Sequence, residues 1–537
     1  MVRLSWQYSF LTGTFTNAYT YDAASNRTGF TAPDSSTDTY SYDTLNRLTT
    51  LANSWAGSFG FSYDSLSRRT QMTRPNSLTT NYTYDNKSRL LSVLHQLSGS
   101  TIDGATYTVD AAGNRTAKTD QLASVTSNYT YDSIYELTQV TQGGTATESY
   151  SYDAVGNRTA SLGVSSYTNN SSNELTATSN ASYSYDNNGN TTSKTESSGT
   201  ANYTWDFENR LTSVTLPNGG GSVTFKYDPF GRRIQKVFTQ NSTTTTTNYV
   251  YDGADTIEET DQNGSLLGKY ARTPNIDEPL AESRSGATSF YEQDGLGSVT
   301  SLSNSAGALA NTYTLDSFGK LTASTGSLTN PLRYTGRDFD TETGFHYYRF
   351  RYYDPSLGRF VSEDLVRFKA GVNFYSYGLN DPADNIDPSG LDTIVCLFPE
   401  AANGLGHIGF GFPGDPYTVG FYPLGPANGS RCSACGQVRR LHGPGAVWPD
   451  VGEGPRQCKR VYTTPTQDKC MLQCRIKRAQ NPGTYDVGGL NCVDFTRDCL
   501  KECGIPAGTN FAQPKDWWPT LPGDPIGGLP PTAPLPR

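Results

Sequence analysis

The first 391 residues of this 537-residue chain contain no cysteine. All nine cysteines follow residue 395, so disulfides or thiolate metal sites can form only in the last part of the chain. Charged residues are scarce, at 17%, which argues against a disordered polyelectrolyte. No run of about 18 apolar residues could span a membrane as a helix. The N-terminus also lacks the pattern of a signal peptide, so we expect any export to use another route.

Proline and charge change at the same place in the sequence. Residues 392–537 hold 19 of the 29 prolines and carry 14 Lys and Arg against 12 Asp and Glu, a net charge of +2. The whole chain has 42 basic and 51 acidic side chains, so residues 1–391 carry 28 against 39, a net charge of −11. Neither part has the strongly positive net charge that favours binding to nucleic acid. The composition therefore predicts a domain boundary near residue 391.

Aromatic residues are abundant, and they recur in a repeat. They make up 12% of the chain, with 35 tyrosines. The repeat consists of Tyr-Asp, a small polar turn and often Asn-Arg. It begins at residues 21, 42, 63, 84, 131, 152, 185 and 227, with variants at Val109 and Trp205. The first three spacings are each 21 residues. The longer interval from 152 to 185 predicts an insertion or a degenerate repeat.

Each repeat predicts a β-hairpin. Segments such as NYTYD alternate aromatic and hydroxyl side chains with the period of two that is typical of a sheet with two unlike faces. Asp, Asn and Gly then supply residues suited to tight turns. One hairpin cannot bury its aromatic face alone, so we expect the units to stack on their neighbours in a mainly β fold. A solvent-exposed fibrous array is the competing interpretation.

These repeats resemble the YD repeats of RHS-type polymorphic toxins over roughly residues 10–390. In that family the hairpins form one long sheet that spirals into a hollow shell around a C-terminal toxic domain. The resemblance implies a YD-repeat β-shell at 1–330, an RHS core at 331–391, and a toxin domain with a Pro-rich tail at 392–537. The repeat region is short for the family, so it fits a small cage, an incomplete cage or the tail of a longer parent.

Residues 331–391 resemble the RHS core segment that closes the shell. The last ten residues, PADNIDPSGL, match the self-cleavage pattern P-x4-D-P-x-G-L of the family. By this resemblance, the scissile bond joins Leu391 and Asp392. That bond coincides with the boundary that composition predicts.

The resemblance also assigns the residues of an aspartic-protease-type site. Such a site needs two carboxylates that share one proton, because like charges a few ångströms apart cannot both ionise. One carboxylate activates water while the other protonates the leaving amine. These roles fall to Asp364 and Asp387, with Arg351 as the basic residue that holds them. The D-P-x-G of the family reads D-L-V-R from Asp364, which alters that turn, and in the competing interpretation the aspartates only cap turns.

Three histidines outside the repeats call for separate interpretations. His346 stands among aromatics in GFHYYRF and is predicted to be a packed sheet residue. GLGHIGFGF indicates a strand that carries His407, whereas His442 lies in a predicted loop.

GGLNCVDFTRDCLKECGIP indicates a helix with Cys492 in its first turn, where the helix dipole favours a thiolate. A histidine on a facing strand would complete a Cys–His nucleophile pair.

This order of a His strand and a Cys helix resembles circularly permuted papain-like cysteine hydrolases of the NlpC type, over residues 403–508. The resemblance implies a small α+β domain with Cys492 as nucleophile and His407 as general base. It implies no cofactor and no resident metal. Peptidoglycan peptide is the favoured substrate, and a lipid or protein acyl bond comes next. The third, orienting residue stays open.

The other eight cysteines have two interpretations. In an oxidising compartment they fit four disulfides, which would stabilise a domain rich in proline and glycine. Alternatively, two pairs of cysteines have the spacing of a zinc site: Cys432, Cys435, Cys470 and Cys474. Disulfides are favoured, and they favour action outside the cytosol, in the periplasm of a target cell or an extracellular setting.

The sequence as a whole predicts a secreted or delivered toxin whose shell encloses and releases a cysteine hydrolase. The expected partners are a cognate immunity protein and a secretion machine or delivery spike, as in type VI secretion, but no nucleic acid. The rival interpretation is a non-enzymatic surface adhesion or interaction protein with a disulfide-rich binding module. A nuclease is a third possibility, which the modest charge of +2 disfavours.

Overall fold

The computed structural model describes residues 2–11, 13–365 and 373–390, together with the backbone of seven strands between Thr393 and Leu529. The chain divides into two compact units. The first unit contains Met1–Ser362 and Tyr375–Ile386, and the second contains Glu363–Phe374 and Asp387–Arg537. The described residues contain strands and short 3-10 turns but no α-helix, which confirms the prediction of a mainly β fold.

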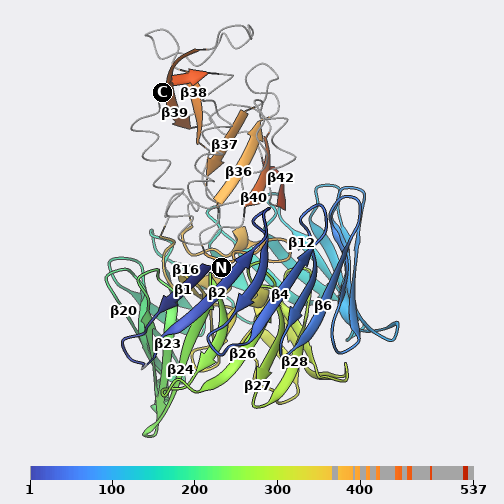
Figure 1. Ribbon diagram of the computed structural model, residues 1–537. Coiled ribbons are helices and arrows are strands. Elements are labelled where there is room, and N and C mark those ends of the chain that lie inside the picture. Colours follow the sequence, from blue (N-terminus) through green and yellow to red (C-terminus); the bar gives the residue numbers. More distant parts are fainter. Residues whose placement is uncertain are drawn as a thin grey trace. The chain divides into compact units, whose positions relative to one another are not determined.

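The first unit is built from two long antiparallel sheets, in which every strand pairs with its neighbours in the sequence (Figure 1). The first sheet has 15 strands: β1 (Val2–Trp6), β2 (Phe15–Tyr21), β3 (Arg27–Thr31), β4 (Thr37–Tyr42), β5 (Leu48–Asn53), β6 (Gly57–Tyr63), β7 (Arg69–Thr73), β8 (Leu78–Tyr84), β9 (Leu90–Leu97), β10 (Ser100–Val109), β11 (Arg115–Asp120), β12 (Val125–Tyr131), β13 (Leu137–Gln142), β14 (Thr145–Tyr152) and β15 (Arg158–Ser161).

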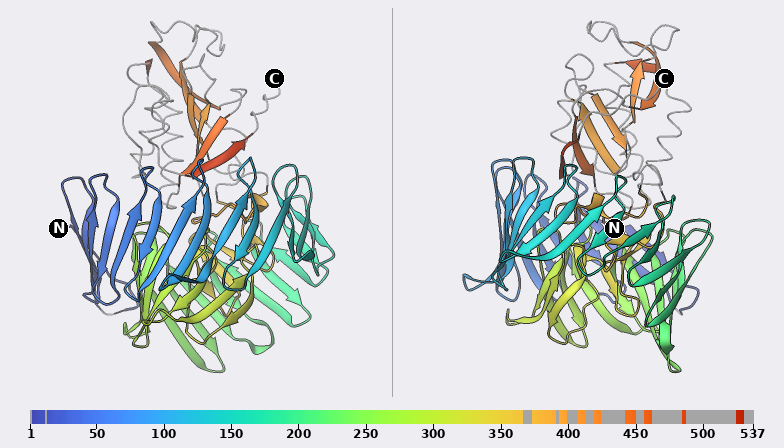
Figure 2. Two further views of the ribbon diagram at one scale, coloured as in Figure 1. Left: turned by 90° about the vertical axis from the view of Figure 1, so that its right-hand side faces the viewer. Right: turned by 180° about the vertical axis from the view of Figure 1, so that it is seen from behind.

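The second sheet continues the same meander after a break at residues 162–166. It has 16 strands: β16 (Tyr167–Asn169), β17 (Leu175–Thr178), β18 (Ala181–Tyr185), β19 (Thr191–Glu196), β20 (Gly199–Trp205), β21 (Leu211–Thr215), β22 (Ser222–Tyr227), β23 (Arg233–Gln240), β24 (Thr243–Asp252), β25 (Asp255–Thr260), β26 (Leu266–Arg272), β27 (Pro279–Arg284), β28 (Ala287–Gln293), β29 (Val299–Ser303), β30 (Leu309–Leu315) and β31 (Leu321–Thr325). Figure 2 shows both sheets curving, the first in blue to teal and the second in green to yellow.

Shorter elements complete the two units. The 3-10 turns are η1 (Pro217–Gly219), η2 (Tyr334–Gly336) and η4 (Gly378–Asn380). A four-stranded sheet holds β32 (Asp338–Asp340), β33 (Phe345–Tyr348), β34 (Arg351–Asp354) and β35 (Arg359–Phe360). The second unit has a seven-stranded sheet in the order β41-β39-β38-β37-β36-β40-β42. Its strands are β36 (Thr393–Phe398), β37 (His407–Gly411), β38 (Val419–Pro423), β39 (His442–Pro449), β40 (Arg456–Val461), β41 (Thr484–Asp486) and β42 (Asp524–Leu529).

The hydrogen bonds of one repeat explain the YD motif. The Asp43 carboxylate accepts hydrogen bonds from the backbone N–H groups of Leu45 at 2.9 Å and Arg47 at 3.0 Å, which closes the turn. Asn46, the fourth turn residue, has φ of 59°, a left-handed conformation that Asn, Gly and Ser tolerate here. The Tyr42 hydroxyl donates to the carbonyl of Arg27 at 2.8 Å, in the preceding repeat.

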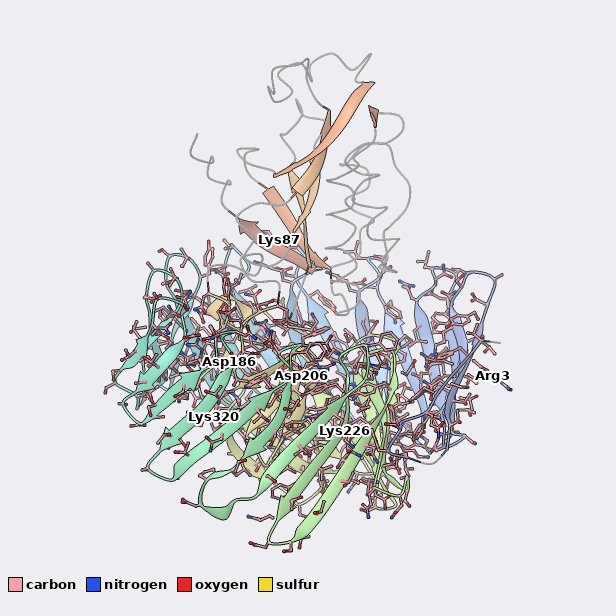
Figure 3. All side chains as sticks on the ribbon, turned by 90° about the vertical axis from the view of Figure 1, so that its left-hand side faces the viewer. Arg3, Lys87, Asp186, Asp206, Lys226 and Lys320 are labelled. Carbon is pink, nitrogen blue, oxygen red and sulfur yellow. The ribbon has the colours of Figure 1, made fainter. Side chains whose placement is uncertain are left out.

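The arginine of the motif reaches forward along the sheet. Arg47 donates from Nε to the Asp43 carboxylate at 2.7 Å and from Nη1 to the carbonyl of Asp64, in the next turn, at 3.0 Å. Tyrosine therefore binds the repeat before, aspartate binds its own turn, and arginine binds the repeat after. Figure 3 labels Lys87, Asp186 and Asp206, which lie in three of these turns.

The interval from 152 to 185 contains a degenerate repeat, one of the two predicted explanations. Asn170 takes the place of the aspartate, and its Oδ1 accepts hydrogen bonds from the N–H groups of Ser172 at 2.9 Å and Glu174 at 3.1 Å. A neutral amide oxygen thus caps the turn with the same geometry. The repeat is concealed in the sequence because Asn169-Asn170 replaces Tyr-Asp.

The two sheets pack against each other along a seam, which we define as the contact of β1–β14 with β24–β31. A buried cluster joins apolar residues of both sheets, including Phe30, Leu51 and Phe59 from the first and Val250, Leu280 and Phe290 from the second. Burial of this aromatic face against a second layer argues against a fully solvent-exposed fibrous array. Four ion pairs also cross the seam: Arg27–Asp252, Arg69–Glu278, Lys118–Asp294 and Lys269–Asp34.

Candidate functional site at the junction

The junction begins with an aromatic core. In the first unit, a cluster of five buried rings is formed by Tyr334, Tyr348, Tyr353, Phe360 and Tyr377. Strand β33 adds His346, which is 1% exposed and whose ring centroid lies 4.9 Å from that of Phe339. Burial lowers the pKa of His346 to about 3, with the Arg333 charge adding to the effect. His346 is thus a neutral packed residue, as predicted.

Arginine–carboxylate pairs hold this core to the second sheet. Arg349 donates to Asp277 at 2.8 and 2.9 Å and to Asp255 at 2.9 Å. Burial alone would raise the pKa of Asp277, but the guanidinium groups of Arg337 and Arg349 hold it below its ordinary value. Removing one member of such a buried pair would leave an uncompensated charge, so the pairs fix the position of β33 and β34.

The predicted basic residue, Arg351, is the first residue of β34. It is 3% exposed, and its guanidinium carbon lies 3.5 Å from the centroid of the Phe360 ring on β35. The side chain is therefore held by the first unit. A buried, ring-stacked guanidinium is a fixed positive charge, which is what a group that holds carboxylates must supply.

The two predicted carboxylates both belong to the second unit. Asp364 is 3% exposed, and its backbone N–H donates to the carbonyl of Phe374 at 3.0 Å. The Asp387 Oδ1 accepts a hydrogen bond from the N–H of Gly390 at 2.6 Å. This bond closes the IDPSG turn immediately before the expected scissile bond. Asp387 thus caps this turn, and such a cap is compatible with a role in cleavage.

The segment Tyr375–Ile386 is tied to the turns of the first sheet. Asn380 Nδ2 donates to the Glu136 carboxyl and to the carbonyl of Gly156, both at 2.8 Å. The backbone N–H of Arg115 donates to the Asp384 carboxyl at 2.8 Å, and its Nη1 donates to the carbonyl of Ala383 at 2.7 Å. The chain just upstream of the expected cleavage point is therefore anchored to the YD-repeat sheet.

This anchored segment contains a carboxyl pair that the sequence analysis missed. Burial raises the pKa of Asp381 well above its ordinary value, and the nearby Asp384 carboxyl raises it further. Burial also raises the pKa of Asp384, which the Arg115 guanidinium opposes. Two acidic residues three apart after a turn carry no signal of burial in the sequence, because the burying partner Arg115 is far away in the chain.

Several predicted residues lie outside the described residues. These are the scissile pair Leu391 and Asp392, the nucleophile Cys492 with its helix, and the cysteines of the alternative zinc site. His407 is the first residue of β37, where its backbone pairs with that of Phe398. His442 begins β39, so the loop predicted there is instead a strand.

The described part of the chain contains neither a membrane-spanning helix nor a metal-binding cluster. No helix there has the length and apolar content to cross a membrane. No group of three or more His, Cys, Asp or Glu side chains in that part is placed to hold a metal ion.

The fold and the junction together define a YD-repeat shell protein: a meander of capped hairpins that ends in an anchored closing segment. A family model described as the teneurin YD-shell matches residues 114–383, which is half of the chain. The chain therefore belongs to the teneurin YD-shell family.

Curated relatives cover parts of this chain. The tRNA3(Ser)-specific nuclease WapA of Bacillus spizizenii is 35% identical over 278 residues, which is 48% of this chain and 12% of that protein. Double-stranded DNA deaminase toxin A of Burkholderia cenocepacia is 30% identical over 202 residues, 33% of this chain and 14% of that protein. Toxin protein Tse5 of Pseudomonas aeruginosa is 35% identical over 102 residues, 19% and 8% respectively. The chain thus spans about an eighth of the length of such relatives.

Solved structures show the same fold. The crystal structure of TcdB2-TccC3-Cdc42 is similar with a TM-score of 0.61 and 19% identity, over 71% of this chain and 22% of that one. The Tc holotoxin pore of Photorhabdus luminescens is similar with a TM-score of 0.60 and 19% identity, over 70% and 21%.

Proposed function

We propose that this chain belongs to an RHS-type toxin, in which a YD-repeat shell carries and releases the effector at residues 392–537. The observation that carries the proposal is the anchored junction: a YD-shell of this family ends in a segment bound to the shell by Arg115 and Asn380. The names of three relatives, which are a nuclease and two toxins, support it.

The same proposal includes self-cleavage between Leu391 and Asp392. Asp364 and Asp387 act as the carboxylate pair, and Arg351 supplies the positive charge that keeps one of them ionised. One carboxylate removes a proton from water as the water attacks the Leu391 carbonyl. The other gives its proton to the Asp392 amide nitrogen, so the C–N bond breaks and a carboxylic acid and an amine are formed.

The proposed effector chemistry is hydrolysis by a cysteine nucleophile. Cys492 attacks an amide or acyl carbonyl, His407 accepts the thiol proton, and N–H groups at the start of the predicted helix stabilise the oxyanion. His407 then gives the proton to the leaving amine or alcohol as its bond to the carbonyl carbon breaks, which leaves a thioester. Water hydrolyses the thioester, which releases the acid and restores the Cys492 thiol. Peptidoglycan peptide is the favoured substrate, which requires delivery to the periplasm. An immunity protein in the producing cell and a delivery machine are the matching partners.

A second candidate effector acts on nucleic acid. The relatives named as a tRNA nuclease and a double-stranded DNA deaminase favour it. The net charge of +2 on residues 392–537 offers little electrostatic attraction for phosphate, so the cysteine hydrolase remains our first proposal.

Bacterial growth distinguishes these effectors. A host expresses residues 392–537 with or without an export signal, beside Cys492→Ala and a Lys501→Ala control. Killing that needs export and Cys492, but not Lys501, is the expected result for a cell-wall cysteine hydrolase. Killing in the cytosol that survives Cys492→Ala contradicts the hydrolase and supports the nucleic-acid effector. Growth in every arm contradicts both effectors and favours a non-enzymatic binding module.

A further inference from the structure

Carboxyl groups of the two sheets face one another at three points along the seam. Glu292 on β28 faces Asp103 on β10. Asp316, in the turn between β30 and β31, faces Glu148 on β14. Glu258 on β25 faces Asp34, in the turn between β3 and β4. Like charges at an interface would repel, so each pair needs either a cation or a proton.

The Glu292–Asp103 pair is placed around shared hydroxyl groups. The Ser301 hydroxyl lies within hydrogen-bond distance of Asp103 Oδ2 and 3.4 Å from Glu292 Oε2. One hydroxyl has one proton, so it can donate to only one of the two carboxyl groups. Asp103 also accepts from the Thr300 hydroxyl at 2.7 Å and from the N–H of Gly104 at 2.6 Å, so a proton on Glu292 would complete the contact. The Ser303 hydroxyl, which lies 2.8 Å from Glu292 Oε1, is already the acceptor for Asn76 at 2.9 Å and can donate to Glu292.

The charges around this pair balance only while Glu292 is neutral. Arg74 is the nearby cation, and it binds the carbonyl of Tyr291 at 2.9 Å. His95 accepts from the Thr80 hydroxyl at Nδ1, 2.9 Å away, and donates from Nε2 to the carbonyl of Gln293, 3.0 Å away, so both ring nitrogens are satisfied in the neutral form. Asp294, which also acts on His95, is paired with Lys118 at 2.7 Å. One cation therefore offsets only one of the two facing carboxyl groups.

The other two pairs also join the two sheets. The Glu148 carboxyl accepts from the N–H of Ser317 at 3.1 Å and from the Tyr150 hydroxyl at 2.7 Å, with Arg158 and Lys320 as the surrounding cations. Glu258 accepts from the N–H of Asp34 at 3.1 Å, and the carboxylate of that aspartate is paired with Lys269 at 2.8 Å. The Ser317–Glu148 and Asp34–Glu258 bonds each cross from one sheet to the other.

We propose that the seam between the two sheets is a pH-operated closure, which holds while each facing carboxyl pair keeps a proton and loosens when that proton is lost. Burial, with the facing carboxylate adding to it, raises the pKa of Glu258 and Asp316 to about 7 and that of Glu292 to about 8. In an open seam these groups would be exposed to water, and their pKa values would return to the ordinary range near 4.

The sign of the effect follows from proton binding. At pH values between the ordinary and the raised pKa values of these groups, the closed seam binds more protons than the open seam does. Closure is therefore favoured at acidic pH and is progressively lost as pH rises through 7 and 8. His95 has the opposite sign, since burial lowers its pKa to about 4, and it favours closure as pH rises from about 4 to 6.5. Three carboxyl pairs outweigh this one histidine. This closure does not depend on the proposed toxin function, because it requires no activity of residues 392–537.

Hydrogen exchange of the full chain tests the closure. We expect protection of β10, β28 and β29, corrected for intrinsic exchange rates, to fall at least ~30-fold between pH 5.5 and 8.5. In the variant Glu258→Gln/Glu292→Gln/Asp316→Asn, which imitates the protonated state, protection should no longer fall over the same range and should rise by up to ~10-fold, the effect that His95 alone gives. Glu208→Gln, an exposed carboxyl in a YD turn, is the matched control and should behave as the unmodified chain does.

The single variant Glu292→Gln is measured in parallel, because the triple variant could also change folding. It should remove part of the pH dependence while matching the unmodified chain at pH 5.5. Equal pH dependence in the unmodified chain and in Glu292→Gln, or protection that rises with pH in the unmodified chain, would overturn the proposal.

Discussion

At the scale of the residue, the YD motif is a set of three bonds rather than a local turn signal. Tyr63 donates to the carbonyl of Leu48 at 2.8 Å, and Asp64 accepts from the N–H groups of Leu66 and Arg68 at 2.9 and 3.0 Å. Sequence analysis could predict the turn from Asp, Asn and Gly. It could not predict the tyrosine bond, because the acceptor lies 15 residues earlier and is reached only after the hairpins stack.

Tyr63→Phe tests the bond to the preceding repeat. The change leaves the ring in place and removes one hydroxyl donor, so the free energy of unfolding should fall by about 1 kcal/mol. Denaturant unfolding measures this loss. Tyr21→Phe is the control, because Tyr21 is 50% exposed and should change stability by less than about 0.5 kcal/mol. Equal losses in both variants would contradict the role given to the tyrosine hydroxyl.

His95→Gln tests the neutral state of a buried histidine. The pKa of His95 is lowered by burial and by Arg74, from 6.5 to about 4. The folded state therefore binds fewer protons than the unfolded state between these values, and the stability that this histidine contributes is lost as pH falls from 6.5 to 4. Thermal unfolding at pH 7 and at pH 4 measures the change. Between these pH values, the free energy of unfolding should decrease by on the order of 2 kcal/mol less in His95→Gln than in the unmodified chain. An identical acid dependence would refute the assignment.

At the scale of the element, the strands and turns were largely predictable and the later repeats were not. The alternating aromatic and hydroxyl residues predicted the hairpins up to Tyr227. Four later turns are closed by Asp261, Asp294, Asn304 and Asp316 in the same way, with the N–H four residues on donating to the side chain. They escaped notice because Thr, Gln, Ser and Leu precede them instead of tyrosine. The cap is what the turn requires, and the tyrosine is an addition to it.

The junction was predictable only in part for a related reason. The motif around Asp387 identified a turn, and the turn is present. The clamps at Asn380 and Asp384 involve Glu136 and Arg115, which lie more than 200 residues away. Such pairings depend on the course of the two sheets, so no local pattern in the sequence indicates them.

Asn380→Asp tests whether the closing segment is anchored by its amide. The substitution replaces a donor with a carboxylate that faces Glu136, a buried carboxyl whose pKa is raised to about 7 by burial. Protection of residues 375–386 from hydrogen exchange should fall at least ~10-fold at pH 8, and less at pH 5.5, where Glu136 is protonated. Asn263→Asp, at an exposed amide in a turn of the second sheet, is the control and should leave the protection of residues 375–386 unchanged. Unchanged protection in Asn380→Asp at pH 8 would show that the amide does not hold the segment.

At the scale of the whole molecule, repeats that stack through their own hydrogen bonds lead into a junction that ends the stack. Each hairpin binds its neighbours through Tyr, Asp and Arg, and the two sheets bind each other through the seam. The chain downstream of Ile386 belongs to the second unit, together with Asp364 and Asp387. A single cut after Leu391 would break the covalent link between the closing segment and residues 392–537.

The most direct test of self-cleavage is the intact mass of the purified full chain after incubation, beside Asp364→Asn, Asp387→Asn and the control Glu208→Gln, an exposed carboxyl in a YD turn. We expect two products, residues 1–391 and 392–537, from the unmodified chain and from Glu208→Gln. We expect one uncut chain from each of the other two variants. An unmodified chain that stays whole, or products that persist in both Asp364→Asn and Asp387→Asn, would contradict self-cleavage at this junction.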